Sequence, residues 1–124
     1  MILYSGRIHP EKGLDLLIDA FAVVHAEYPQ LRLRIIGPTA VRDGAGGDSY
    51  VRALRDRADG LPVEFVPPIY DRRAFAAVLQ SGHYYCYPSL AEKGESFPVA
   101  PLEAMATGLM PIVSNLACFH DLMT

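Results

Sequence analysis

The chain alternates short apolar runs with longer stretches of helical periodicity, and this alternation limits its fold more than any other feature. The runs that read as strands are residues 2–5, 31–36, 63–66, 83–87 and 112–114. The stretches that read as helices are residues 12–27, 48–59, 72–80 and 101–107. Strands that alternate with helices form parallel sheets whose crossover helices cover both faces. We therefore expect an α/β fold, a Rossmann-like parallel sheet of about five strands with helices on both faces.

Local signals indicate where several helices begin and end. In residues 12–27 the inward positions follow a spacing of three and four residues; they are Leu14, Leu17, Ile18, Phe21, Val24 and His25. Asp48 or Ser49 is a candidate cap for the second helix, and Asp71 for the third. Gly108 is placed to end the short helix before it. The DGAGG segment within residues 41–47 lacks the Lys-Ser/Thr of a P-loop, so we expect a flexible loop.

Composition excludes several classes of protein. The 124 residues, 51% apolar and 20% charged, suit one globular domain. A net charge of -3 argues against nucleic acid as a partner. The two cysteines, Cys86 and Cys118, form no C-x-x-C motif, and no apolar run approaches the length of a membrane span, so we expect a reducing, cytoplasmic location. The abrupt start in a strand and end in a helical pattern suggest a piece of a longer chain.

Ligands of open parallel sheets bind at the carboxyl ends of the strands, which directs attention to SGRIHPEKG after the first strand. Arg7 and Lys12 flank a turn that Gly6 opens and Pro10 shapes, and Lys12 begins the predicted helix. Two cations at a helix N-terminus favour an anion such as phosphate. The alternative is that Lys12 is solvated and Arg7 pairs with a nearby acid.

A second candidate segment, PSLAEKGESFPVAPLEAMATG, follows the fourth strand. Glu95 lies in the loop and Glu103 about one turn into the helix. Carboxylates accept hydrogen bonds from sugar hydroxyls, and backbone N–H groups hold phosphate, so the segment suits a phosphorylated, hydroxylated ligand. The alternative is that Glu95 is an ordinary loop charge and Glu103 a first-turn acid favoured by the helix dipole.

Together these two motifs resemble the C-terminal, nucleotide-sugar-binding domain of the family-4 retaining glycosyltransferases, one half of a GT-B fold. Glu95 and Glu103 enclose seven residues, AMATG follows, and the GR…EKG segment stands upstream, so the resemblance spans about residues 2–120. It implies that residues 1–124 are a partial donor-binding domain that lacks the N-terminal acceptor domain.

The resemblance also implies residue roles. Arg7 and Lys12 match the pair that neutralises the donor diphosphate, Glu103 the ribose ligand, and Glu95 the glutamate beside the transferred sugar. The catalytic positions it implies are Glu95, Arg7 and Lys12. The donor-binding positions it implies are Gly6, Arg7, Lys12, Gly37, Pro68, Ile69, Ser96, Phe97, Val99 and Glu103.

The expected function is binding of a nucleoside-diphosphate-sugar donor in a retaining hexosyl transfer to a glycan, lipid or small acceptor. The full-length enzyme would act on the acceptor through its N-terminal domain, with peripheral membrane association allowed, whereas the isolated chain would be inactive. No Asp-x-Asp motif occurs and the four histidines (His9, His25, His83 and His120) are scattered, so we expect neither metal nor cofactor. The sequence does not identify the base, the sugar, the acceptor or the oligomeric state.

This sequence departs from the family at three places. Ser96 and Pro98 replace glycines of the usual Glu-Gly-Phe-Gly loop, His83 replaces a common aspartate, and AEKG lengthens the approach to Glu95. Two alternatives stay open, a GT-B sugar-nucleotide epimerase domain and a non-catalytic α/β interaction module. An oxidoreductase would need Gly-x-Gly-x-x-Gly after the first strand, which SGRIHPEKG lacks.

Overall fold

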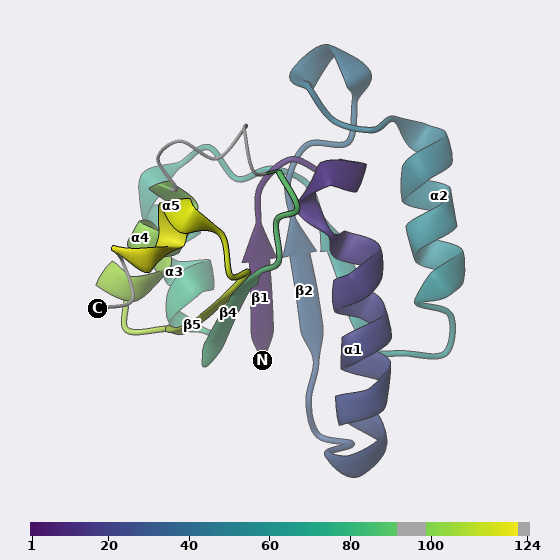
Figure 1. The fold of residues 1–124 in the computed structure, drawn as a ribbon, viewed down its shortest axis with the longest axis horizontal. Coiled ribbons are helices and arrows are strands. Elements are labelled where there is room, and N and C mark those ends of the chain that lie inside the picture. The colour runs from purple at the N-terminus through teal and green to yellow at the C-terminus, as the bar shows by residue number, and fades with distance from the viewer. Residues whose placement is uncertain (92–98, 122–124) are drawn as a thin grey trace.

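A computed structural model describes residues 1–91 and 99–121 as a five-stranded parallel sheet with helices packed against it (Figure 1). The strands are β1 (Ile2–Ser5), β2 (Leu33–Ile36), β3 (Val63–Val66), β4 (Tyr84–Tyr87) and β5 (Met110–Val113). The α-helices are α1 (Leu14–Glu27), α2 (Asp48–Arg57), α3 (Arg72–Gln80), α4 (Val99–Ala106) and α5 (Ala117–His120). Two 3-10 turns, η1 (Pro10–Lys12) and η2 (Val41–Asp43), complete the described elements.

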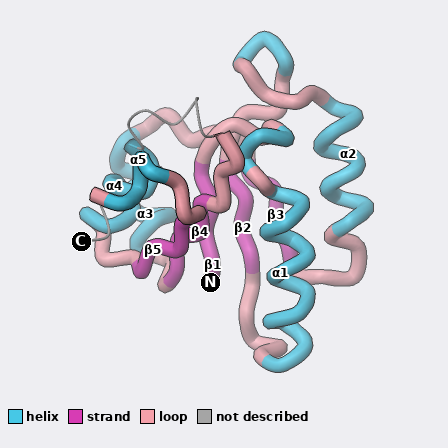
Figure 2. Tube along the Cα trace, viewed as in Figure 1, coloured by secondary structure: helices cyan, strands magenta, loops and turns pink. Residues whose placement is uncertain are grey.

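The strand order β3-β2-β1-β4-β5 places β1 at the centre of the sheet. The chain moves outward from β1 to β3 and then returns to the other side of β1 with β4, as Figure 2 shows. The order therefore reverses between β1 and β4, the place where open α/β sheets bind ligands. Leu3, Tyr4 and Ser5 are at most 6% exposed, and successive strand residues face opposite sides, so helices cover both faces. The predicted Rossmann-like fold class is confirmed.

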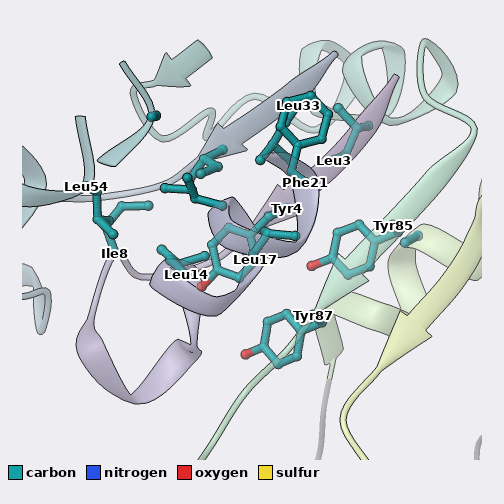
Figure 3. Close-up of a cluster of buried hydrophobic side chains, with 14 of the residues drawn as sticks. Leu3, Tyr4, Ile8, Leu14, Leu17, Phe21, Leu33, Leu54, Tyr85 and Tyr87 are labelled. Atoms are coloured by element: carbon teal, nitrogen blue, oxygen red, sulfur yellow. The ribbon is translucent and has the colours of Figure 1, made fainter. Parts of the chain in front are cut away.

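Helix α1 packs on the sheet through the apolar stripe that the sequence predicts. Leu14, Leu17, Ile18 and Phe21 are buried and join strand residues in one core, part of which Figure 3 shows. Val24, predicted to face inward, is instead 40% exposed. It borders an open apolar hollow together with Ile2 of β1, Tyr84 of β4 and Ile112 of β5.

The start of the first helix differs from the prediction. Residues 10–12 form η1, and α1 begins only at Leu14, because Gly13 between them adopts a left-handed conformation with φ of 68°. A Cβ atom at position 13 would also lie 2.2 Å from the Pro88 carbonyl oxygen. Lys12 therefore belongs to a turn that is separate from the helix and is pressed against the segment after β4.

Helix caps were predicted correctly for α3 and incorrectly for α2. The Asp71 side chain accepts a hydrogen bond from the Ala74 N–H at 2.8 Å. The residue before α2 is Gly47, which offers no side-chain cap, while Asp48 is the first helical residue. The loop predicted to be flexible contains η2, and its Ala45 is 5% exposed. Strand and helix limits elsewhere shift by one or two residues, as is usual for element ends.

In the ranges 1–91 and 99–121, no helix is both long and apolar enough to cross a membrane.

Candidate functional site

A hollow of about 220 Å³ opens at the carboxyl edge of the sheet and brings together residues that are distant in sequence. Its walls come from the ends of β1 and β2, the loop after β3, and helices α3 and α4. The lining residues are Ser5, Gly6, Ile36, Gly37, Pro38, Pro68, Ile69, Phe75, Ala100 and Glu103. Five of the predicted donor-binding positions are therefore neighbours; they are Gly6, Gly37, Pro68, Ile69 and Glu103.

Two glycines make the floor of this hollow by letting their backbones approach closely. A Cβ atom on Gly37 would lie 1.8 Å from the Gly6 carbonyl oxygen, a distance that no side chain allows. The Gly6 N–H donates to Ile36 O at 3.0 Å, and the Gly37 N–H donates to Val66 O at 3.1 Å. The ends of three strands are thus held together while their peptide groups stay uncovered by side chains.

Arg7 follows Gly6 directly and is held at two points. Its Nη1 donates to the Gly44 carbonyl at 2.7 Å, and its Nη2 forms an ion pair with Glu11 Oε1 at 2.6 Å. The alternative that Arg7 pairs with a nearby acid is therefore what the structure shows. Its side chain remains 42% exposed.

Lys12 has a different environment from the one that a solvated surface lysine would have. It is only 5% exposed, and its Nζ lies 5.4 Å from the centre of the Tyr87 ring. The Leu90 N–H donates to Glu11 O at 2.7 Å, which ties η1 to the segment after β4. The motif SGRIHPEKG and residues 88–91, which begin the second motif 75 positions after Gly13, consequently meet in space.

The acidic motif is described only in part. Glu103 lies on α4, is exposed and borders the hollow, and Val99 is the first residue of that helix. Glu95, Ser96 and Phe97 lie outside the described residues, so their predicted roles stay predictions. The roles predicted for Arg7, Lys12 and Glu103 also stay predictions, although their positions around one edge are compatible with one ligand.

The structure adds residues that the sequence did not single out. Phe75, from the first turns of α3, and Ala100, from the first turn of α4, line the hollow with Ser5 and Pro38. The cap at Asp71 already indicated that α3 starts at the carboxyl edge, and Phe75 is four residues further on the same face. This signal was available, but an apolar helix residue is more often part of the core.

Other candidates have structural roles. His9 precedes η1, and its Nδ1 accepts the Glu11 N–H at 3.1 Å. Ser89, which follows β4, is 1% exposed, and its Oγ accepts the Ala91 N–H at 3.3 Å. Tyr85 and Tyr87 are buried, whereas Tyr84 is 43% exposed. Among the described residues, no cluster of three or more His, Cys, Asp or Glu side chains could hold a metal ion.

Comparison with curated proteins gives relatives of the same kind along the whole chain. The chain is 34% identical over 119 residues to the D-inositol 3-phosphate glycosyltransferase of Jonesia denitrificans, covering 94% of this chain and 27% of that protein. It is 31% identical over 124 residues to the GDP-mannose-dependent alpha-(1-6)-phosphatidylinositol dimannoside mannosyltransferase of Mycobacterium tuberculosis, covering 100% of this chain and 29% of that protein. The chain thus spans under a third of the length of these relatives.

A solved structure supports the fold. Anabaena HepE, described in complex with UDP and glucose, superposes with a TM-score of 0.79 at 21% identity, over 98% of this chain and 31% of that one. The family described as glycosyl transferases group 1 matches residues 1–123. By this match over nearly its whole length, the chain belongs to the group 1 glycosyl transferases.

Proposed function

We propose that this chain binds the nucleoside-diphosphate-sugar donor of a retaining, metal-independent hexosyltransferase. One observation carries the proposal: the hollow at the carboxyl edge collects Gly6, Gly37, Pro68, Ile69 and Glu103 beside the turn that holds two cations. A sheet edge of this kind, at the point where strand order reverses, is the usual ligand site of open α/β folds.

Each wall of the hollow suits one part of such a donor. Pro68, Ile69 and Phe75 offer apolar surface and main-chain groups to a nucleobase. The Glu103 carboxylate can accept hydrogen bonds from ribose hydroxyls. Arg7 and Lys12 would balance the charge that grows on the diphosphate as the sugar leaves, and preorganised cations lower such a barrier without a metal ion.

The relatives support the same class of donor. The relative from Mycobacterium tuberculosis is described as GDP-mannose-dependent, and the Anabaena structure as a complex with UDP and glucose. We propose that transfer itself, to a glycan, lipid or small acceptor, needs the whole protein, in which an N-terminal domain would bind the acceptor. We place that whole enzyme in the cytoplasm, with peripheral membrane contact for a lipid acceptor.

Calorimetric titration of the chain with GDP, UDP and ADP, first in EDTA and then with magnesium, tests the proposal. We expect one nucleotide to bind saturably in EDTA. The Arg7→Ala/Lys12→Ala variant should bind it at least about 100-fold more weakly, because two charge-assisted contacts are lost. An Arg32→Ala/Arg57→Ala variant removes the same charge far from the hollow and should bind like the wild type.

Three results would contradict parts of the proposal. Absence of binding to all three nucleotides would refute donor binding by this chain. Binding only with magnesium would refute metal independence. An equal loss in both double variants would show that net charge, rather than the cation turn, governs affinity.

A further inference from the structure

Three tyrosine rings form a stack at the carboxyl end of the sheet, beside the turn that carries the cations. Tyr4 comes from β1, and Tyr85 and Tyr87 come from β4 (Figure 3). The ring centres of Tyr4 and Tyr87 are 5.7 Å apart with a 12° angle between planes, and those of Tyr85 and Tyr87 are 6.3 Å apart with an 11° angle. All three are at most 6% exposed. A buried tyrosine hydroxyl normally has a hydrogen-bond partner. The partners of these hydroxyls therefore show which parts of the chain the stack fixes in place.

Two of the hydroxyls bond to the backbone on either side of Gly6. The Tyr4 O–H donates to the Arg7 carbonyl at 2.8 Å. The Tyr85 O–H donates to the Ser5 carbonyl at 2.9 Å, and the Ser5 Oγ lies 2.9 Å from the same phenol oxygen. Burial raises the pKa of Tyr85 well above its ordinary value, so this hydroxyl stays a donor. The segment that leads from β1 into Arg7 is therefore fixed from inside the protein.

The third ring contacts the other cation. Tyr87 presents its face to the Lys12 ammonium, 5.4 Å from the ring centre, within the range of a cation–π interaction. The same ring packs near the turn: a Cβ atom on Gly6 would lie 3.5 Å from Tyr87 Cε2 and 2.8 Å from the Tyr4 hydroxyl oxygen. One rigid stack thus touches both ends of the segment that bears Arg7 and Lys12.

We propose that Tyr4, Tyr85 and Tyr87 are positioning residues that hold Arg7 and Lys12 in place for the diphosphate of the donor. This inference rests on the proposed function. A free lysine side chain loses considerable conformational entropy when it is fixed on a ligand. A lysine already held against an aromatic face has lost part of that entropy before binding. A smaller entropy loss then opposes its attraction to phosphate, and the affinity is higher.

Substitution of Tyr87 tests this directly. Each of UDP, GDP and ADP, and the matching nucleosides uridine, guanosine and adenosine, is titrated against wild type, Tyr87→Leu and Tyr87→Phe. Tyr87→Leu should lower the affinity for the nucleoside diphosphate by about tenfold, in the range of a desolvated cation–π contact. Its affinity for the nucleoside should stay unchanged. Tyr87→Phe keeps the ring face and should stay within about twofold of wild type. Tyr84→Leu makes the same change at the other end of β4, on an exposed tyrosine, and should change neither affinity.

The outcomes separate this inference from the proposed function. If the wild type binds no nucleotide, the proposed function fails, and the inference fails with it. If the wild type binds and Tyr87→Leu loses nucleoside and diphosphate equally, or loses neither, only the positioning role is overturned.

A second variant covers the case in which Tyr87→Leu does not fold. Tyr4→Phe keeps the buried ring and removes only the hydroxyl that donates to the Arg7 carbonyl. It should lower the affinity for the nucleoside diphosphate about threefold, as expected for one neutral hydrogen bond, and leave the affinity for the nucleoside unchanged. An unchanged diphosphate affinity in Tyr4→Phe would then refute the inference.

Discussion

The two halves of the sheet are packed to very different degrees, and the candidate site joins them. In β2, Leu33, Ile35 and Ile36 are at most 2% exposed, whereas in β5 Met110 is 61% and Ile112 50% exposed. β2 is an inner strand between β1 and β3, whereas β5 is an edge strand, as β3 also is (Figure 2). The cation turn emerges from the packed half, and Glu103 from the half with exposed apolar side chains. The site thus combines segments from both halves of the sheet.

Matched isoleucine truncations in the two halves should give the largest difference. Ile35→Ala removes a fully buried side chain and should lower the free energy of unfolding by about 3 kcal/mol. Ile112→Ala removes a side chain that is 50% exposed and should cost less than about 1 kcal/mol. Urea unfolding followed by circular dichroism measures both. Equal costs would mean that β5 is covered in solution by a surface that the described residues do not supply.

The sequence predicts the packed half better than the exposed half, for a physical reason. The apolar spacing of α1 and the alternation of strands and helices follow from burial, and the structure confirms both. Val24 was predicted from its spacing to face inward, yet it borders the open apolar hollow, as Tyr84 does. Hydrophobic patterning identifies a surface that can be buried, but it does not identify what covers it.

The sequence predicted which segments form the site, but it did not predict which side chains contact one another there. The sequence placed Gly6 and Gly37 after strands and Glu103 about one turn into a helix, and the fold brings these three together. The sequence offered an acidic partner for Arg7 as an alternative, and the structure identifies that partner as Glu11. The contact of the Tyr87 ring with Lys12 joins segments that are distant in the sequence, and no local pattern encodes it.

Glu103→Gln should change only the contacts that α4 contributes to the site. Under the proposed function, the change removes a charged acceptor for the ribose hydroxyls, so ribonucleoside diphosphate affinity should fall about tenfold. The nucleotide with a 2′,3′-dideoxyribose lacks these hydroxyls and should bind wild type and variant equally. Parallel titrations of both nucleotides measure the effect. An equal loss of affinity for both nucleotides would show that Glu103 supports the local structure around α4 and does not bind the ribose.

Helix caps offer a smaller test of the same contrast between halves. Asp71 caps α3 with its side chain, so Asp71→Ala should cost about 1 kcal/mol of unfolding free energy. Asp48 makes no cap on α2, and Asp48→Ala should cost only about 0.3 kcal/mol through the helix dipole. Thermal and urea unfolding of the two variants provide the comparison. A larger cost at Asp48 would mean that α2 needs local support despite its place in the packed half.

The smallest expected effect concerns how firmly the cation turn is set before a ligand arrives. Glu11 pairs with Arg7 at 2.6 Å, but the two side chains are 36% and 42% exposed, so the pair contributes little to stability. Glu11→Gln keeps the shape and a hydrogen-bond acceptor while it removes the negative charge beside the expected diphosphate. Diphosphate affinity should therefore rise about threefold, with nucleoside affinity unchanged.

A matched control for Glu11→Gln is Asp19→Asn, which neutralises the exposed carboxylate that pairs with Arg57 at 2.7 Å, away from the hollow. It should leave both affinities unchanged. The charge effect should also shrink as salt rises, because exposed charges are screened over about 8 Å at physiological ionic strength. A fall in diphosphate affinity in Glu11→Gln would reverse the interpretation: Glu11 would then be an orienting partner that Arg7 needs, and the ion pair would belong to the preformed wall together with the tyrosine stack.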